Sequence, residues 1–300
     1  MKRPHLARLT LFLAVLSLSL AVAQTNGDSV SLFDGKTLHG WVGTEGFWRV
    51  DGGAITAGSY DKDVPQNEFI CTEKSYANFE LALKIKCSGD LNTGQVNSGI
   101  QIRSARLPDG AVAGYQVDCG KGWFGKIYDE HRRRLIYPTP VDEVALLKGV
   151  DTFGWNEFRI LAEGPRIQVW INGIKASDYT EENPDIPLNG IIAPQIHKGG
   201  HAMVQFKDVI IRELPPTPNA PTWESLGGPE VALQLVKSKQ KPTAKRSKAA
   251  PAPTAPTDPS VPPLKPKKVV SEYNGQGEPR PATEQAKMFK LPAGYEIELV

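Results

Sequence analysis

Polar side chains recur at alternate positions in three strand-like segments of this chain, and their types could move protons. The pairs are Gln101 and Arg103, Gln116 and Asp118, and Gln195 and His197. Because successive side chains of a strand point to opposite faces, each pair shares one face. If the strands are neighbours, that face carries a guanidinium, a carboxylate, an imidazole and three amides, which suit a polyhydroxylated ligand. The same alternation is typical of an ordinary solvated sheet face, and periodicity alone favours that interpretation.

The region from residue 29 to residue 214 predicts an all-β domain that would position these side chains. Val, Ile, Phe, Tyr and Trp recur in short alternating runs, which Gly, Asn, Asp and Pro separate. Asn172-Gly173 is the strongest hairpin signal, since both central residues of a tight turn must tolerate positive φ. Many strands at short spacing, without intervening helices, predict an antiparallel β-sandwich or jelly roll.

The first 23 residues predict an export signal. Three basic residues precede an apolar run over 9–20, and residues 21–23 form an Ala-Val-Ala cleavage site. The run is too short for a membrane span, which needs about 20 apolar residues. We therefore expect an exported protein of the periplasm, the cell envelope or the extracellular space, with no transmembrane segment after cleavage.

The composition changes after the β region. Residues 215–270 are rich in Pro, Lys and Ala, which predicts a disordered linker. The total charge is +2, of which the signal contributes +3 and residues 237–268 contribute +8, so the remainder carries −9. An acidic globular part gives no support to nucleic-acid binding. Order signals return over 271–300, and we expect these residues to begin a second, truncated domain.

Three cysteines, Cys71, Cys87 and Cys119, lie in the β region. An odd number leaves at least one thiol unpaired in a monomer. A bridge between Cys71 and Cys87 and a set of small buried hydrophobic residues on strands are both compatible with the sequence.

Eight landmarks along residues 31–214 resemble, in order, the 3-keto-disaccharide hydrolase domain family of exported bacterial proteins. The clearest are Leu-Phe-Asp-Gly-Lys at 32–36, Asn-Ser-Gly-Ile-Gln-Ile-Arg at 97–103 and Gln-Ile-His at 195–197. The resemblance implies a concanavalin A-like β-sandwich, or jelly roll, that acts on 3-keto-glycosides. A short match over 285–300 resembles the start of planctomycete-type membrane-associated or haem-containing dehydrogenase domains, which implies a fused or partner oxidoreductase.

The implied reaction exploits the ketone at C3, which acidifies the proton on C2. Loss of that proton gives an enolate that expels the glycosidic oxygen from C1, and water then adds, so that the net result is hydrolysis. This route needs a base near C2, a cation or hydrogen-bond donors for the enolate oxygen, and an acid for the leaving group.

Three residues are the catalytic candidates. Arg103 is assigned to the C3 oxygen, because its planar fork offers several donors. Because an imidazole can give or take a proton near neutral pH, His197 is the first choice of base or acid, with Asp118 as its partner or as the alternative base. The competing interpretation is a cross-strand ion pair between Arg103 and Asp118, and a histidine that is only hydrogen-bonded at a strand end.

The substrate-binding candidates are Gln101, Gln116, Gln195, Glu68 and Trp123. Trp123 could stack on a pyranose ring or act as a core or loop anchor. For Glu68 the alternative is a surface loop. The polar segment 128–134 is interpreted as a solvated loop or as the rim of a cleft.

No cofactor is predicted. The residues Asp129, Glu130, His131, His197 and His201 include metal-ligand types, but their spacing matches no compact metal motif. Calcium is compatible with a sandwich of this class.

Two functions remain open from the sequence. One is an enzyme that cleaves a keto-sugar or oligosaccharide substrate. The other is a non-catalytic, lectin-like carbohydrate-binding module of a larger envelope oxidoreductase, since fold alone does not choose between them.

Overall fold

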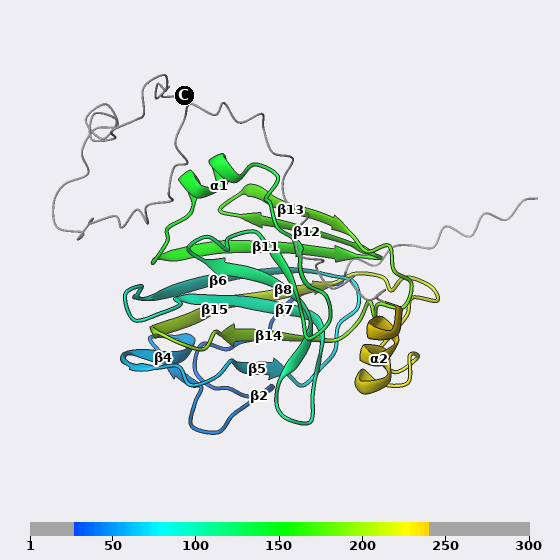
Figure 1. The fold of residues 1–300 in the computed structure, drawn as a ribbon, viewed down its shortest axis with the longest axis horizontal. Helices are drawn as coiled ribbons and strands as arrows, with labels where there is room; N and C mark the ends of the chain where they lie inside the picture. The colour runs from blue at the N-terminus through cyan, green and yellow to red at the C-terminus, as the bar shows by residue number, and fades with distance from the viewer. Residues whose placement is uncertain (1–26, 240–300) are drawn as a thin grey trace, which may run out of the picture. The chain divides into compact units, whose positions relative to one another are not determined.

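The structure is a computed structural model that describes residues 27–239. Over these residues the chain forms two antiparallel sheets that pack face to face (Figure 1). The predicted antiparallel β-sandwich is therefore confirmed. The predicted export signal, the second domain over 271–300 and the linker beyond residue 239 lie outside the described residues.

The first sheet has eight strands within the described residues. In spatial order they are β13 (Ile174–Thr180), β12 (Arg166–Ile171), β11 (Trp155–Glu163), β6 (Phe79–Asp90), β15 (His201–Glu213), β4 (Ala54–Asp63) and β3 (Arg49–Asp51), with β1 (Ser29–Ser31) paired to β15. Asn172 and Gly173 join β12 to β13 with φ values of 49° and 79°. The predicted hairpin is thus present, and its two residues adopt the positive φ that the turn requires.

The second sheet carries the predicted polar strands. Its seven strands, in spatial order, are β10 (Arg134–Tyr137), β9 (Ile127–Glu130), β8 (Val112–Gly120), β7 (Asn97–Arg106), β14 (Ile191–Ile196), β5 (Glu68–Thr72) and β2 (Trp41–Gly43). The three strands of interest, β8, β7 and β14, are consecutive neighbours, as the candidate site requires.

The main core lies between the two sheets. The inward-facing residues predicted by alternation, Ile100, Ile102, Tyr115, Val117 and Ile196, are all fully buried in it. From the opposite sheet, Phe79, Leu81, Leu83 and Ile85 alternate along β6 into the same core. The polar residues between them along β7 and β8 must therefore face away from the core.

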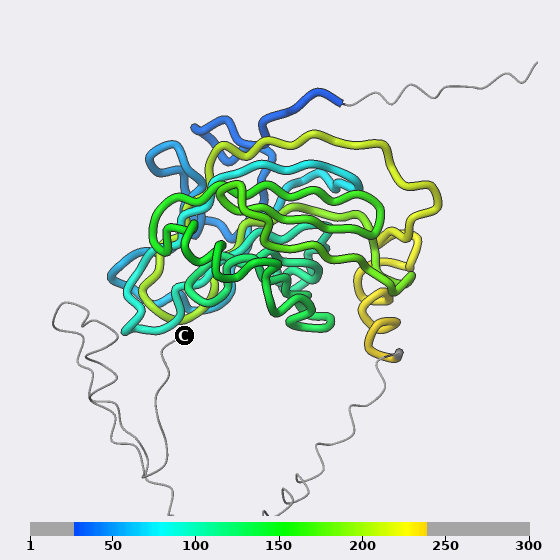
Figure 2. The backbone as a smooth tube through the Cα atoms, turned by 90° about the horizontal axis from the view of Figure 1, so that it is seen from above, coloured from blue at the N-terminus to red at the C-terminus, as the bar shows by residue number. Residues whose placement is uncertain are grey.

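Two helices are present in the described residues. Helix α1 (Glu143–Gly149) is capped at its N-terminus by Asp142, whose carboxylate accepts a hydrogen bond from the backbone N–H of Ala145. Helix α2 (Pro229–Lys239) lies at one end of the sandwich (Figures 1 and 2). Neither helix is long and apolar enough to cross a membrane.

The expected start of the linker at residue 215 is wrong. Residues 215–239 continue over the sandwich, and Trp223, Ala232 and Leu233 pack against Ala105 and Ala113 in a small second core. Residues 215–239 contain few apolar residues, so their composition resembles that of a linker. The apolar residues of α2 and of the loop before it nevertheless lie together on one surface.

The three cysteines are buried and unpaired in the structure. Cys71 and Cys87 do not form a disulfide, and burial raises the pKa of these thiols to about 11 and about 12. The interpretation as small buried residues is the one that the structure confirms.

Candidate functional site

Four of the predicted polar residues meet on the outer face of the seven-stranded sheet. Gln101 of β7 lies opposite Gln116 of β8, and Gly99 lies between Asp118 on one side and Gln195 of β14 on the other. Residues directly opposite each other in an antiparallel pair project to the same face. The expectation that these four side chains share a face is confirmed.

A chain of hydrogen bonds links three of these side chains and ends on Asp118. The Ser104 hydroxyl donates to Gln101 Oε1 (2.8 Å), Gln101 Nε2 donates to Gln116 Oε1 (2.9 Å), and Gln116 Nε2 donates to Asp118 Oδ1 (2.7 Å). In both glutamines, Gln101 and Gln116, the amide oxygen accepts from the Ser104 side of the chain and the amide nitrogen donates toward Asp118. The chain therefore holds one carboxyl oxygen of Asp118 in place and leaves the other, Oδ2, for a ligand.

Several buried polar atoms around Gly99 have no hydrogen-bond partner in the structure. They are Asp118 Oδ2, both amide atoms of Gln195, and Asn97 Oδ1. Gly99 cannot carry a side chain in this arrangement, because a Cβ there would clash with the Gln116 side chain at 2.7 Å from its Cγ. Buried polar atoms are almost always paired, because an unpaired one costs about 1–3 kcal/mol. This set is therefore suited to the hydroxyl and carbonyl groups of a sugar.

The carboxyl group of Asp118 is fully buried, and burial raises its pKa well above the ordinary range. The hydrogen bond from Gln116 and the charge of Lys126 lower this pKa, whereas the charge of Glu130 raises it. A buried carboxyl group with a raised pKa retains its proton at higher pH, which suits a general acid.

Arg103 is not on this face, so its predicted position is wrong. Its backbone adopts φ of 48°, and the pairing of β7 with β8 shifts register between Ile102 and Ala105. This bulge interrupts the alternation. The guanidinium donates instead to Ala77 O (2.8 Å), Gly164 O (2.6 Å) and Asn78 Oδ1 (3.0 Å).

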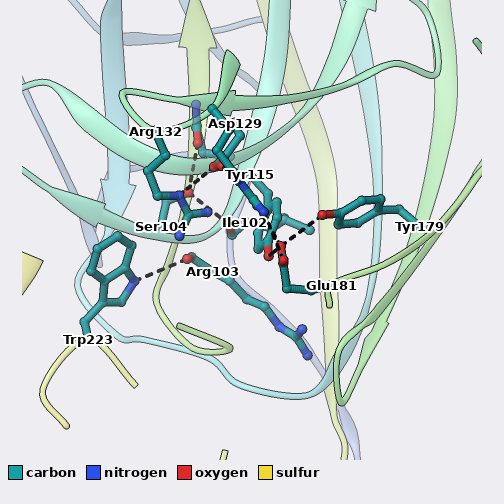
Figure 3. Close-up of polar contacts among 11 residues, drawn as sticks. Ile102, Arg103, Ser104, Tyr115, Asp129, Arg132, Tyr179, Glu181 and Trp223 are labelled. Atoms are coloured by element: carbon teal, nitrogen blue, oxygen red, sulfur yellow. Dashed lines mark hydrogen bonds and ion pairs between the residues drawn. The ribbon is translucent and has the colours of Figure 1, made fainter. Parts of the chain in front are cut away.

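Ser104 takes the position on the outer face that alternation assigned to Arg103. Figure 3 shows the Arg103 side chain extending away from Ser104. Gly114 on β8 makes room for this arrangement, because a Cβ there would lie 2.2 Å from the Ser104 hydroxyl oxygen. Burial lowers the pKa of Arg103 to about 10, and its three acceptors are uncharged. Arg103 thus has a structural role, because its hydrogen bonds join β7 to the residues just before β6 and just after β11.

His197 directly follows β14 and continues its pairing, since its backbone N–H donates to Asn97 O (3.1 Å). By alternation from Gln195 it belongs to the outer face. Its ring atom Nδ1 lies 2.8 Å from Lys198 O. Because a carbonyl oxygen only accepts, Nδ1 carries the hydrogen, and Nε2 of the neutral ring is left as an acceptor. Half-buried His197 is thus arranged as a base.

Glu68 points to the other side of the sheet, so it does not share the face of Gln195. It lies opposite Ile196, whose side chain enters the core. Its carboxylate accepts hydrogen bonds from Thr44 (2.6 Å) and Gln66 (2.7 Å). Trp123 is half-buried in the loop between β8 and β9, with Lys126 Nζ 5.5 Å from its ring centroid.

Four further residues of this face were not among the predicted catalytic or substrate-binding residues. Asn97, Lys126, Tyr128 and Glu130 alternate with core residues in the same manner as Gln116 and Asp118, and the pairing of β9 with β8 places the last three beside them. The signal was the alternation of residues 126–130, which the interpretation of 128–134 as a loop obscured.

Part of the polar segment 128–134 forms a buried ionic network (Figure 3), whereas His131 and Arg134 are exposed as in a solvated loop. Asp129 accepts from Arg132 Nε (2.6 Å) and Arg133 Nε (2.5 Å). Arg133 also forms a bidentate pair with Glu181 (2.9 and 2.6 Å), which Tyr115 joins through its hydroxyl. The described residues include no group of three or more His, Cys, Asp or Glu that could hold a metal ion.

The Glu181 pair predicts acid sensitivity. Burial alone would raise the pKa of Glu181, but the hydrogen bonds from Arg133 and Tyr115 lower it from 4.5 to about 2. A carboxylate with a depressed pKa stabilises the fold above its unfolded pKa, and this contribution is lost as pH falls from about 4.5 to about 2. We expect it to reach about 3 kcal/mol at neutral pH.

Urea unfolding at pH 7, 4 and 3 would measure this effect. Glu181→Gln should lower the free energy of unfolding at pH 7 and flatten its decline toward pH 3. Glu182→Gln, at the neighbouring exposed position, is the control. An unchanged pH slope in Glu181→Gln would contradict the assignment.

Comparison with known proteins identifies the domain. Residues 28–212, more than half of the chain, match the family described as 3-keto-alpha-glucoside-1,2-lyase-like domain. The chain belongs to this family. The resemblance inferred from the eight sequence landmarks is confirmed, and the membership indicates a carbohydrate-related function. No curated protein matches the chain.

Several solved structures are similar to this chain. Two candidate glycosyl hydrolases from Parabacteroides distasonis ATCC 8503 are 22% and 25% identical, each over 62% of this chain and over 94% and 100% of their own, both with a TM-score of 0.46. The carbohydrate-binding module CBM66 from Bacillus subtilis is 16% identical over 58% of this chain and 96% of its own, with a TM-score of 0.42. At these TM-scores none of them bears on the choice between catalysis and binding.

Proposed function

We propose that this family member is an exported enzyme that cleaves 3-keto-glycosides by elimination between C1 and C2, followed by hydration. The observation that carries the proposal is the set of unpartnered buried atoms around Gly99: Asp118 Oδ2, the Gln195 amide and Asn97 Oδ1. They combine a titratable carboxyl group with donors and acceptors that match sugar hydroxyl groups. The family description, which names 3-keto-alpha-glucosides and a 1,2-lyase, supports the same chemistry.

The proposed first step is proton abstraction. His197 Nε2 takes the C2 proton, the C–H electrons form the C2–C3 double bond, and the carbonyl electrons move onto the C3 oxygen. The arrangement of His197 supports this role, because its Nδ1–H is held by Lys198 O. Such a positioned base contributes about 10²–10⁴ in rate.

The proposed second step is expulsion of the leaving group. The C3 carbonyl re-forms, the electrons of the enolate make the C1–C2 double bond, and the C1–O bond breaks with its electron pair on oxygen. Asp118 supplies the proton to that oxygen. Its raised pKa, caused by burial, supports a protonated Asp118 in the resting enzyme. Water then adds its hydroxyl group to C1 and gives its proton to Asp118, while His197 returns its proton to C2, which completes hydrolysis and restores both residues.

A sugar can reach the buried polar side chains of this face only past the residues that surround them. Gln101, Gln195 and Asp118 are buried, whereas Lys126, Tyr128, Glu130 and His197 around them are half-buried. Two cavities, of about 470 and 350 Å³, lie elsewhere, beside Arg106 and α2 and beside Trp41 and Trp48. In our proposal the sugar enters past the half-buried side chains and displaces them.

The test uses the purified chain with a 3-keto-disaccharide and its unoxidised parent. We expect cleavage of the keto form alone, and loss of cleavage in His197→Gln. Binding of both sugars without turnover would contradict catalysis and support the lectin-like module instead. Because a C3 ketone must first be made, the substrate has to come from a sugar-oxidising dehydrogenase, for which a fused or partner oxidoreductase remains our proposal.

A further inference from the structure

The proposed reaction needs a positive charge or several donors at the C3 oxygen, where negative charge collects in the enolate. Arg103 cannot supply it, because its guanidinium is committed to Ala77, Gly164 and Asn78. We propose that Lys126 holds the C3 oxygen of the keto sugar as the enolate forms. This inference rests on the proposed function and adds a catalytic residue to it.

Lys126 lies beside Asp118 on the outer face. The backbone N–H of Asp118 donates to Lys126 O (3.0 Å), which extends the pairing of β8 and β9 by one position. Lys126 precedes Ile127, a core residue, so its side chain belongs to the outer face with Asp118. Across this face the order of positions is Lys126, Asp118, Gly99 and Gln195, so the backbone of Lys126 lies at one end of the row that carries the unpartnered atoms of Asp118 and Gln195.

Lys126 forms no ion pair with a carboxylate among the described residues. Lys74, Lys84 and Lys175 each pair with a carboxylate, whereas Lys126 occurs in none of the ion pairs between described residues. Its Nζ lies 5.5 Å from the centroid of the Trp123 ring. Lys126 is thus half-buried beside an aromatic ring and is not neutralised by an ion pair with a described carboxylate.

Its electrostatic effect already reaches the site. The charge of Lys126 lowers the pKa of Asp118, against the larger effect of burial. The same field acts on any oxygen placed beside Asp118. As the C2 proton leaves and the carbonyl electrons move to the C3 oxygen, an ammonium at that oxygen stabilises the developing charge. When the carbonyl re-forms in the second step, Lys126 keeps its own proton, so it acts as a charge and a hydrogen-bond donor only.

The experiment compares Lys126→Met and Lys126→Arg with the wild-type chain on a 3-keto-disaccharide. We measure cleavage and, in D₂O, deuterium uptake at C2 of the uncleaved substrate, which reports enolate formation separately from hydration. Lys126→Met should lose about 10²–10³-fold in kcat/KM and a similar factor in C2 exchange. Lys126→Arg keeps the charge and should retain more activity than Lys126→Met. Lys121→Met removes an exposed lysine of the same loop and is the matched control, expected within twofold of wild type.

The outcomes separate the two proposals. If wild type cleaves the keto sugar and Lys126→Met does so at an unchanged rate, the inference on Lys126 is overturned while the proposed function stands. If wild type neither cleaves nor exchanges, both are overturned. Circular dichroism melting of Lys126→Met checks its folding. If that variant is unfolded, Lys126→Arg decides the question: a folded Lys126→Arg that loses C2 exchange by about the 10²–10³-fold expected for Lys126→Met would overturn the role of the charge.

Discussion

Asp118→Asn should abolish most of the cleavage activity while leaving the fold intact or more stable. Asparagine can still accept from Gln116 Nε2 through its side-chain oxygen, so the hydrogen-bond chain from Ser104 is preserved. It cannot donate a proton to the leaving oxygen as a carboxylic acid does. We expect kcat to fall by about 10²–10⁴, the usual contribution of a positioned acid or base. Steady-state kinetics on a 3-keto-disaccharide measures the loss.

The stability of the same variant gives an independent check. The pKa of Asp118 is raised in the folded state, because burial disfavours the carboxylate. A carboxyl group with a raised pKa stabilises the fold at low pH, and this contribution is lost as pH rises through its folded pKa. Wild type should therefore lose stability between pH 5 and pH 8 relative to Asp118→Asn. Thermal unfolding at both pH values tests this, with Asp109→Asn at an exposed turn as the control.

Wild-type activity in Asp118→Asn would refute the acid role. A lower melting temperature of this variant at pH 8 would contradict the assignment of the raised pKa. These two measurements are independent, since the activity depends on proton donation by Asp118 and the stability depends on the effect of burial on its pKa.

Arg103→Ala should act on stability before it acts on chemistry. The guanidinium is fully buried and donates to Ala77 O, Gly164 O and Asn78 Oδ1, which tie β7 to the opposite sheet. Truncation removes the Arg103 donors to Ala77 O and Gly164 O, whereas Asn78 Oδ1 still accepts from the backbone N–H of Gly164, and we expect a loss of about 3–5 kcal/mol. Arg103→Lys keeps one charge but not the planar fork, so it should recover only part of this loss.

Urea unfolding measures these variants, with Arg106→Ala as the control. Arg106 is exposed three positions further along β7, and its replacement should cost less than about 0.5 kcal/mol. An Arg103→Ala protein that unfolds like wild type but no longer cleaves the keto sugar would return Arg103 to the catalytic set.

The alternation of polar and apolar residues predicted much of this molecule. It correctly assigned Ile100, Ile102, Tyr115, Val117 and Ile196 to the core. It also placed Gln101, Gln116, Asp118 and Gln195 on one face, because a strand has a side-chain period of two wherever its pairing is regular. The Asn172-Gly173 turn was predicted for a local reason as well, since its φ values depend on those two residues.

The failures share a cause that is not local. Nothing in Ile102-Arg103-Ser104 marks a bulge, yet positive φ at Arg103 exchanges the faces of Arg103 and Ser104. The energy that holds this conformation comes from Ala77, Asn78 and Gly164, which are distant in sequence. Glu68 was misplaced because its face depends on its register with Ile196, and residues 215–239 pack through Trp223 on strands that they follow by about a hundred positions.

The amino-acid order alone therefore determined the β-sandwich, the family and most of the polar face, since each depends on periodicity and short motifs. The tertiary structure decided which groups surround Asp118. It removed Arg103 and Glu68, and it brought Asn97, Lys126 and Glu130 to the site. The physical reason is that a strand's own sequence sets which side chains share a face, whereas strand neighbours, register and bulges are set by hydrogen bonds to other parts of the chain.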